Sequence, residues 1–99
     1  MNECLVILVA VPALEESLVD WLLERPEIAD FTSMPISAHN ASANIMSMHE
    51  QVSGRRRQVM FQLRLSADVL EAVLAGLRES FRGAQLEYWA LPILSSGRM

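Results

Sequence analysis

One segment near the start of the chain constrains the fold more than any other. Residues Cys4–Val11, CLVILVAV, contain no polar side chain, and branched residues dominate the run. Alternate side chains of a strand point to opposite sides, so this run is typical of a central strand that is covered on both faces. The rest of the chain, or its neighbours, must therefore provide apolar cover for two sides of this strand.

A helix is predicted directly after this strand. Pro12 suits the first turn of a helix, and Arg25 and Pro26 mark its end. The apolar residues between them recur at helical spacing on one face: Leu14, Leu18, Trp21 and Leu22. Residues Ile28–Ser37 follow as a weaker strand, in which Pro35 suits a sheet edge or a bulge.

The same order of elements returns in the second half. Residues Gln58–Leu65 alternate between polar or methionine side chains and apolar ones, which predicts a strand with one face in a core. Ser66 is suited to cap a second helix, and Gly83 is suited to end it. The apolar stripe of that helix is Leu70, Val73, Leu74, Leu77 and Phe81. Residues Gln85–Leu94 are the last predicted strand.

Two strand-helix-strand halves joined by a loop predict a single α+β domain over residues 1–99. The expected architecture is a ferredoxin-like βαββαβ sandwich, a four-stranded antiparallel sheet with both helices on one face. No third helix remains to cover the second face of Cys4–Val11. Apolar residues make up 52% of the chain, which is high for its length. We therefore expect the sheets of several copies to cover one another.

The loop between the halves carries soft metal donors. Its sequence from Ser37 to Gln58 is SAHNASANIMSMHEQVSGRRRQ. Together His39, Met46, Met48 and His49 would suit copper(I) or zinc better than magnesium or calcium, which prefer carboxylates. The spacing matches no zinc signature, so a second interpretation stays open. In it, the methionines pack on the body of the protein and the histidines are solvated.

The end of this loop carries a cluster of arginines. Gly54 permits a tight turn or the close approach of a ligand. Arg55 and Arg57 would point to one side of an extended strand, and Arg56 to the other. Two guanidinium groups can clamp phosphate, carboxylate or bicarbonate. Ion pairs between subunits are the alternative use of the same residues.

Charge and composition exclude several functions. The net charge is −4 and the chain has no lysine, so nucleic-acid binding is not expected. No Ser-His-Asp order, Cys-His pair or paired carboxylates indicate an enzyme. The single cysteine, Cys4, permits no internal disulfide, and Glu3 precedes an apolar run that lacks the features of a signal peptide. We expect a cytoplasmic protein.

Three stretches of the sequence resemble the PII-like superfamily, and most closely a small bacterial subgroup of unassigned function. They are VPALEESLVDWLLE after the first strand, HEQVSGRRRQVMFQL across the end of the loop, and LEYWALPIL in the last strand. The resemblance implies a homotrimer with a long T-loop, here residues 38–54. It also implies ligand clefts between subunits at the base of that loop.

Two departures from the PII pattern limit what is carried over. The loop has no tyrosine that could be modified, since the only tyrosine is Tyr88. The stretch before the last strand, FRGAQLEYW, holds a single glycine where PII proteins have a glycine-rich nucleotide loop. Uridylylation is therefore not expected, and binding of ATP or ADP is not favoured.

The sequence thus predicts a PII-like sensor or regulatory protein without enzymatic activity. It would bind a small ligand or ion at clefts between subunits and act on a partner through residues 38–54. The alternative is a soft-metal accessory protein that binds copper or zinc, because the resembling subgroup is often encoded beside heavy-metal efflux pumps. A membrane efflux system or another regulated protein would then be the partner.

Overall fold

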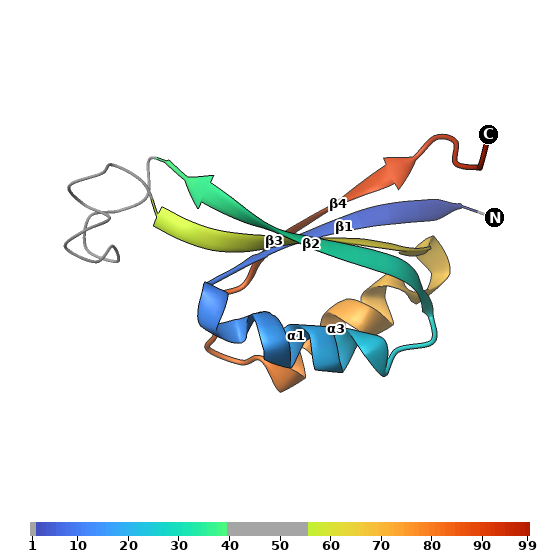
Figure 1. Ribbon diagram of the computed structural model, residues 1–99. Coiled ribbons are helices and arrows are strands. Elements are labelled where there is room, and N and C mark those ends of the chain that lie inside the picture. The colour runs from blue at the N-terminus through green and yellow to red at the C-terminus, as the bar shows by residue number, and fades with distance from the viewer. Residues whose placement is uncertain (1, 40–55) are drawn as a thin grey trace.

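The computed structural model describes residues 2–39 and 56–99. The elements follow the predicted order, with a short 3-10 turn before each helix (Figure 1). They are β1 (Glu3–Ala10), η1 (Pro12–Leu14), α1 (Glu15–Leu23), β2 (Ile28–Ala38), β3 (Arg56–Ser66), η3 (Ala67–Val69), α3 (Leu70–Ser80) and β4 (Glu87–Ile93).

The four strands form one antiparallel sheet in the order β2-β3-β1-β4. Both helices lie on the same face of this sheet, as Figure 1 shows. The order and the layers are those of the ferredoxin-like α+β sandwich, so the predicted fold is confirmed. β1 lies between β3 and β4, as its apolar sequence requires.

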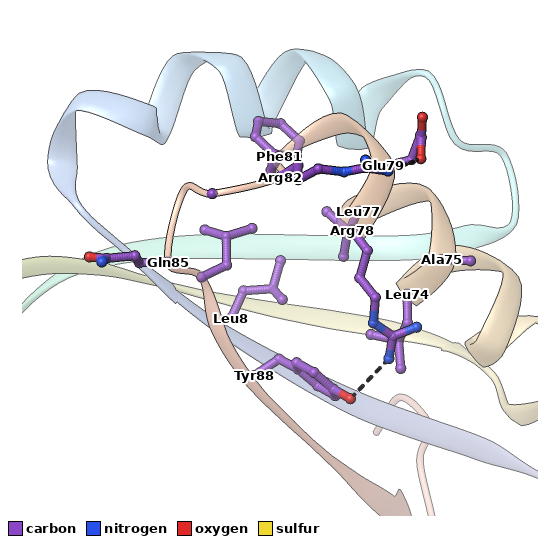
Figure 2. A pocket seen from close by; sticks show the side chains of 12 residues that line it. Leu8, Leu74, Ala75, Leu77, Arg78, Glu79, Phe81, Arg82, Gln85 and Tyr88 are labelled. Carbon is purple, nitrogen blue, oxygen red and sulfur yellow. Dashed lines mark hydrogen bonds and ion pairs between the residues drawn. The ribbon is translucent and has the colours of Figure 1, made fainter.

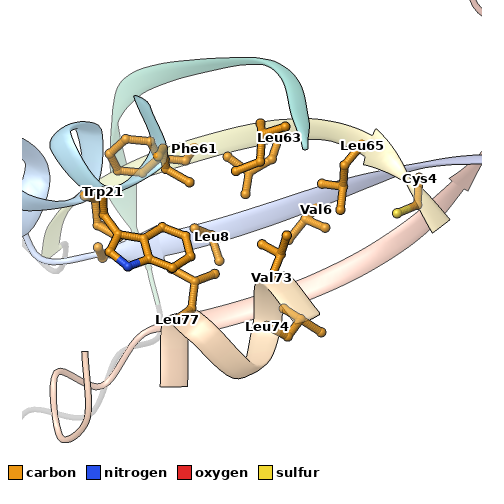
Figure 3. Packing of buried hydrophobic residues seen from close by; sticks show 14 of the residues in the cluster. Cys4, Val6, Leu8, Trp21, Phe61, Leu63, Leu65, Val73, Leu74 and Leu77 are labelled. Atoms are coloured by element: carbon orange, nitrogen blue, oxygen red, sulfur yellow. The ribbon is translucent and has the colours of Figure 1, made fainter. Parts of the chain in front are cut away.

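The core lies between the sheet and the two helices (Figure 3). Val6 and Leu8 of β1 point into it, with exposed fractions of 0% and 1%. On β3 the predicted alternation holds from Val59 to Leu65, where the odd-numbered apolar residues are buried and Met60, Gln62 and Arg64 are half-buried. Gln58 departs from it, because it is buried as well. The helices contribute Leu18, Trp21, Leu22, Val73, Leu74 and Leu77. Burial of this kind is worth about 25 cal/mol per Å² of apolar surface.

The opposite face of the sheet, called the open face below, is apolar along β1 and β4. Leu5 pairs with Leu91 and Ile7 pairs with Trp89 across these strands. The two β1 residues are half-buried, while Trp89 and Leu91 are 44% and 46% exposed. In the single chain, Trp89 therefore lies outside the core. The expected second apolar face of the first strand is confirmed.

The ends of the elements differ from the prediction where the backbone turns. Ser66 caps as expected, since its Oγ accepts a hydrogen bond from the Asp68 backbone N–H at 3.3 Å. β4 begins at Glu87 instead of Gln85, because Gln85 has a left-handed φ of 59° that a strand residue cannot adopt. Gly83 is also left-handed, with φ 78°, but the predicted cap at Gly83 is wrong, because α3 ends at Ser80 and its C-cap is Phe81.

β2 extends through Ala38, which the sequence analysis had placed in the loop segment 38–54. Residues 40–54 of that segment lie outside the described residues. In the parts of the chain that the structure describes, no helix is long and apolar enough to cross a membrane.

Candidate functional site

The end of β2 and the start of β3 meet where the chain enters and leaves residues 40–55. Ser37 is the register partner of Arg57, and Ala38 is the partner of Arg56. Because successive strand residues point to opposite faces, the two arginines lie on opposite sides of the sheet, as predicted. Arg57 shares the helix side with Val59. The other two predicted anion ligands, Gly54 and Arg55, lie outside the described residues.

A cavity of about 410 Å³ opens at this place, and we call it the loop-base cavity. It lies on the helix side of the hairpin, where the start of the first helical segment faces the two strands. Its lining residues are Pro12, Glu15, Pro35, Ile36, Ser37, Arg57, Gln58 and Val59. Four elements, η1, α1, β2 and β3, therefore form its wall.

The polar groups of this cavity have opposite charges. Arg57 carries a guanidinium group with five N–H donors, and Glu15 carries a carboxylate on the first turn of α1. The same carboxylate accepts a hydrogen bond from the Ser33 hydroxyl, with 3.4 Å between Oγ and Oε2. The Ser37 hydroxyl can donate or accept. An oxyanion that also has an O–H group would find both a cation and a proton acceptor here.

Of the four predicted metal donors, one lies within the described residues. His39 directly follows β2 and is exposed. Met46, Met48 and His49 lie outside the described residues. Within residues 2–39 and 56–99, no group of three or more His, Cys, Asp or Glu side chains is placed to hold a metal ion. The copper or zinc site therefore stays a prediction.

Cys4 belongs to the core and not to a site. Its side chain is 5% exposed, and it lies at the start of β1 beside Leu65 and Pro92 of the neighbouring strands. Burial raises the pKa of the Cys4 thiol, because the charged thiolate loses its hydration. A free cysteine in such a place packs as a small hydrophobic residue.

The sequence alone did not indicate that Pro12 and Glu15 line the same cavity as Arg57. Pro12 was expected only to begin a helix. A strand-helix-strand unit brings the start of its helix to the end of the sheet where its second strand finishes. That topological rule was the signal that could have placed Glu15 beside Ser37 and Arg57.

The family model described as "Protein of unknown function (DUF3240)" matches residues 1–99. The chain belongs to the DUF3240 family. No curated protein matches the sequence. Because the match extends over the whole chain, the family contains both halves of the sandwich and the segment between them.

Solved structures place this DUF3240 chain among PII-like folds. A DUF3240 family protein from Shewanella baltica OS155 is 22% identical, with a TM-score of 0.81 and coverage of 100% of this chain and 98% of that one. The PII-like protein CPII from Thiomonas intermedia K12, described as bound to ADP, AMP and bicarbonate, is 15% identical over 100% and 98% of the two chains, with a TM-score of 0.71.

A third similar structure is the ATP complex of GlnK from B. subtilis, with 13% identity, a TM-score of 0.66 and coverage of 94% and 85%. At these identities the likeness concerns the fold. The predicted PII-like architecture is thereby confirmed for this DUF3240 chain.

Proposed function

We propose that this protein is a PII-like regulator that binds a small oxyanion in the loop-base cavity. The observation that carries the proposal is the meeting of Arg57, Glu15 and Ser37 where two strands lead into residues 40–55. A ligand bound at this point would contact both strand ends that flank residues 40–55. It can therefore bias the conformation of residues 38–54, through which the protein would act on a partner.

The donor set favours an oxyanion that retains a proton. Arg57 would bind the negatively charged oxygens, and the Glu15 carboxylate would accept a hydrogen bond from the O–H group. Bicarbonate, hydrogen phosphate and α-hydroxy carboxylates have this combination. A carboxylate without an O–H group, such as acetate, would instead place its second oxygen against Glu15, and like charges disfavour that arrangement. Bicarbonate is also named with the similar protein CPII.

We propose further that three copies assemble with their open faces together and complete the cavity at a subunit boundary. Support comes from the apolar side chains of β1 and β4 that face away from the helices. The role that we propose is binding, and the described residues of this cavity include one carboxylate and neither histidine nor cysteine.

Thermal shift in matched ionic strength tests the proposal. Bicarbonate should raise the Tm of the wild type, while acetate should not, and a ligand at tenfold its Kd adds about 1.4 kcal/mol of stability. For a domain of this size, 1 kcal/mol corresponds to about 4–8 °C. AMP and ADP serve as further probes. We do not expect them to raise the Tm, because the stretch before β4 has a single glycine, which does not favour nucleotide binding.

The variants Arg57→Gln and Glu15→Gln test the guanidinium group and the carboxylate of the proposed site separately. Arg57→Gln should abolish the bicarbonate shift, and Glu15→Gln should remove the preference for bicarbonate over acetate. Arg98→Gln removes the same charge from the C-terminal segment and should respond like the wild type. Equal shifts in Arg57→Gln and the wild type would contradict the proposal.

A further inference from the structure

A second and larger cavity lies between the last turns of α3 and the start of β4 (Figure 2). We call it the α3–β4 cavity. Its volume is about 650 Å³, and it shares no lining residue with the loop-base cavity. Its floor is apolar and includes Leu8, Leu77 and Leu86. Cavities of this size with apolar walls and a few polar groups are typical of small-molecule sites.

Two of the polar residues that line this cavity, Arg78 and Tyr88, lie together. Arg78 extends from α3 to Tyr88 of β4, and its Nη2 donates a hydrogen bond to the tyrosine hydroxyl at 3.3 Å. Figure 2 shows this pair beside the apolar floor. The bond is long and uses one of the five N–H donors of the guanidinium group. The remaining donors and the tyrosine O–H can serve a ligand.

Arg78 and Arg82 carry the same charge, but their surroundings differ. Arg82 also lines the cavity, but its Nη2 is 2.7 Å from the Glu79 carboxylate, and Figure 2 shows it extending away from Tyr88. In the described part of the chain, Arg78 makes no such ion pair, and the group it contacts is neutral. A positive charge without a carboxylate partner therefore borders an apolar hollow.

The segment after α3 forms one wall of the cavity. Gly83 and Gln85 both have left-handed backbone conformations, with φ of 78° and 59°, and the Ala84 N–H donates to the Phe81 carbonyl at 3.1 Å. A left-handed conformation at a residue with a side chain is unfavourable, so the surrounding structure imposes it. In Figure 2 the Gln85 side chain points away from Leu8 and Tyr88. No glutamine side chain therefore fills the space above the floor.

We propose that the α3–β4 cavity binds an amphipathic organic anion, a molecule with a flat apolar body and one carboxylate, phosphate or sulfonate group. The body lies on Leu8, Leu77 and Leu86, and the anionic group meets Arg78 and the Tyr88 hydroxyl. Binding removes apolar surface from contact with water and adds charge-assisted hydrogen bonds. This proposal does not depend on the oxyanion site at the loop base.

Two fluorescent probes that differ in charge test it. 8-Anilinonaphthalene-1-sulfonate has the required body and one sulfonate, and N-phenyl-1-naphthylamine has the same body without the charge. The wild type should bind the sulfonate at least about tenfold more tightly, since hydrogen bonds between charged groups are the strong ones. Equal affinity for the two probes would overturn the role of Arg78.

Four variants locate the site. Arg78→Gln should weaken sulfonate binding about tenfold and leave the neutral probe unchanged, and Tyr88→Phe should weaken it less. Arg98→Gln is the control for charge, and Leu91→Gln is the control for binding on the open face. Both controls should bind like the wild type, with circular dichroism confirming that each variant is folded. Loss of sulfonate binding in Leu91→Gln with retention in Arg78→Gln would place the probe on the open face and refute the proposal.

Discussion

Trp21 is held in the helix layer by three kinds of contact. Its Nε1 donates a hydrogen bond to the Ser80 hydroxyl at 3.0 Å, and the Arg25 guanidinium lies 3.9 Å from its ring centroid. The Phe81 ring meets it edge-on, with centroids 6.3 Å apart. These contacts fix the indole between α1 and α3, so atoms added beside it have little room.

Gly76→Ala tests this constraint. A Cβ at residue 76 would lie 2.9 Å from Cζ2 of Trp21, which is closer than carbon atoms pack. In an open helix the change from glycine to alanine stabilises by about 1 kcal/mol. Here we expect a loss of about 1–3 kcal/mol in the free energy of unfolding, measured by urea denaturation. Gly97→Ala, where no atom lies within 4 Å, is the control. A gain in stability for Gly76→Ala would show that the indole moves freely.

The buried thiol of Cys4 predicts a pH effect. Burial raises the pKa of Cys4, so the folded state keeps its proton at pH values where the unfolded chain has lost it. This contribution to stability is complete below the ordinary thiol pKa of about 8.5 and is lost as the pH rises further. Above that pH the free energy of unfolding should fall more steeply for the wild type than for Cys4→Ala. Parallel slopes in the two proteins would contradict this.

At the level of elements, β1 has two faces that its sequence does not distinguish. Leu8 is 1% exposed and points into the helix-covered core, whereas Ile7 is half-buried on the open face. A run without polar residues predicts that both faces are covered but gives no sign of which is covered by the helices. Only the register with β3, in which Leu8 pairs with Phe61, assigns the faces.

Alanine substitution distinguishes these faces. Leu8→Ala should lower the free energy of unfolding by about 2–5 kcal/mol, because it leaves a cavity beside Phe61. Ile7→Ala should cost only about 1 kcal/mol in the dissociated chain, because this side chain is already partly solvated. Chemical denaturation at low protein concentration measures both. Similar losses for the two variants would mean that the open face is covered within the single chain.

The elements themselves were largely predictable, because periodicity records which side of each element is buried. The stripe of α3 and the alternation of β3 are examples, and both are seen in the structure. The sites were less predictable. The cavity wall formed by Glu15 and Arg57 joins residues that no short motif contains, and the α3–β4 cavity depends on the left-handed Gln85. The backbone conformation of a single residue such as Gln85 is difficult to predict from amino-acid sequence.

At the scale of the whole molecule, the open face predicts assembly. The wild type should scatter light with three times the 11.1 kDa mass of one chain. Ile7→Glu places a charge among apolar neighbours on the open face, so it should dissociate the assembly while circular dichroism stays unchanged. Leu23→Glu adds the same charge at a residue of α1 that is 69% exposed, and it should assemble normally. A monomeric wild type at micromolar concentration would remove the trimer proposal.

The soft-metal alternative also concerns the whole molecule, because its donors belong to the segment between the two halves. If it holds, calorimetry should detect copper(I) or zinc binding to the wild type and much weaker binding to His39→Ala/His49→Ala. Neutral imidazole is the ligand, so affinity should decrease below about pH 6.5. Met34→Leu, which changes a methionine of β2, is the control. Equal affinity in the double variant and the wild type would exclude the histidines.

The two tryptophans lie on opposite sides of the sheet, and this gives the protein two separate optical signals. Trp21 is 8% exposed among the helices, so its emission should shift to longer wavelength only when the core melts. Trp89 is 44% exposed on the open face, so its emission should shift to shorter wavelength when another surface covers it. A Trp89→Phe protein then reports folding alone, and a Trp21→Phe protein reports association. Association on dilution and unfolding in denaturant can thus be followed separately, each in its own variant, without any attached dye.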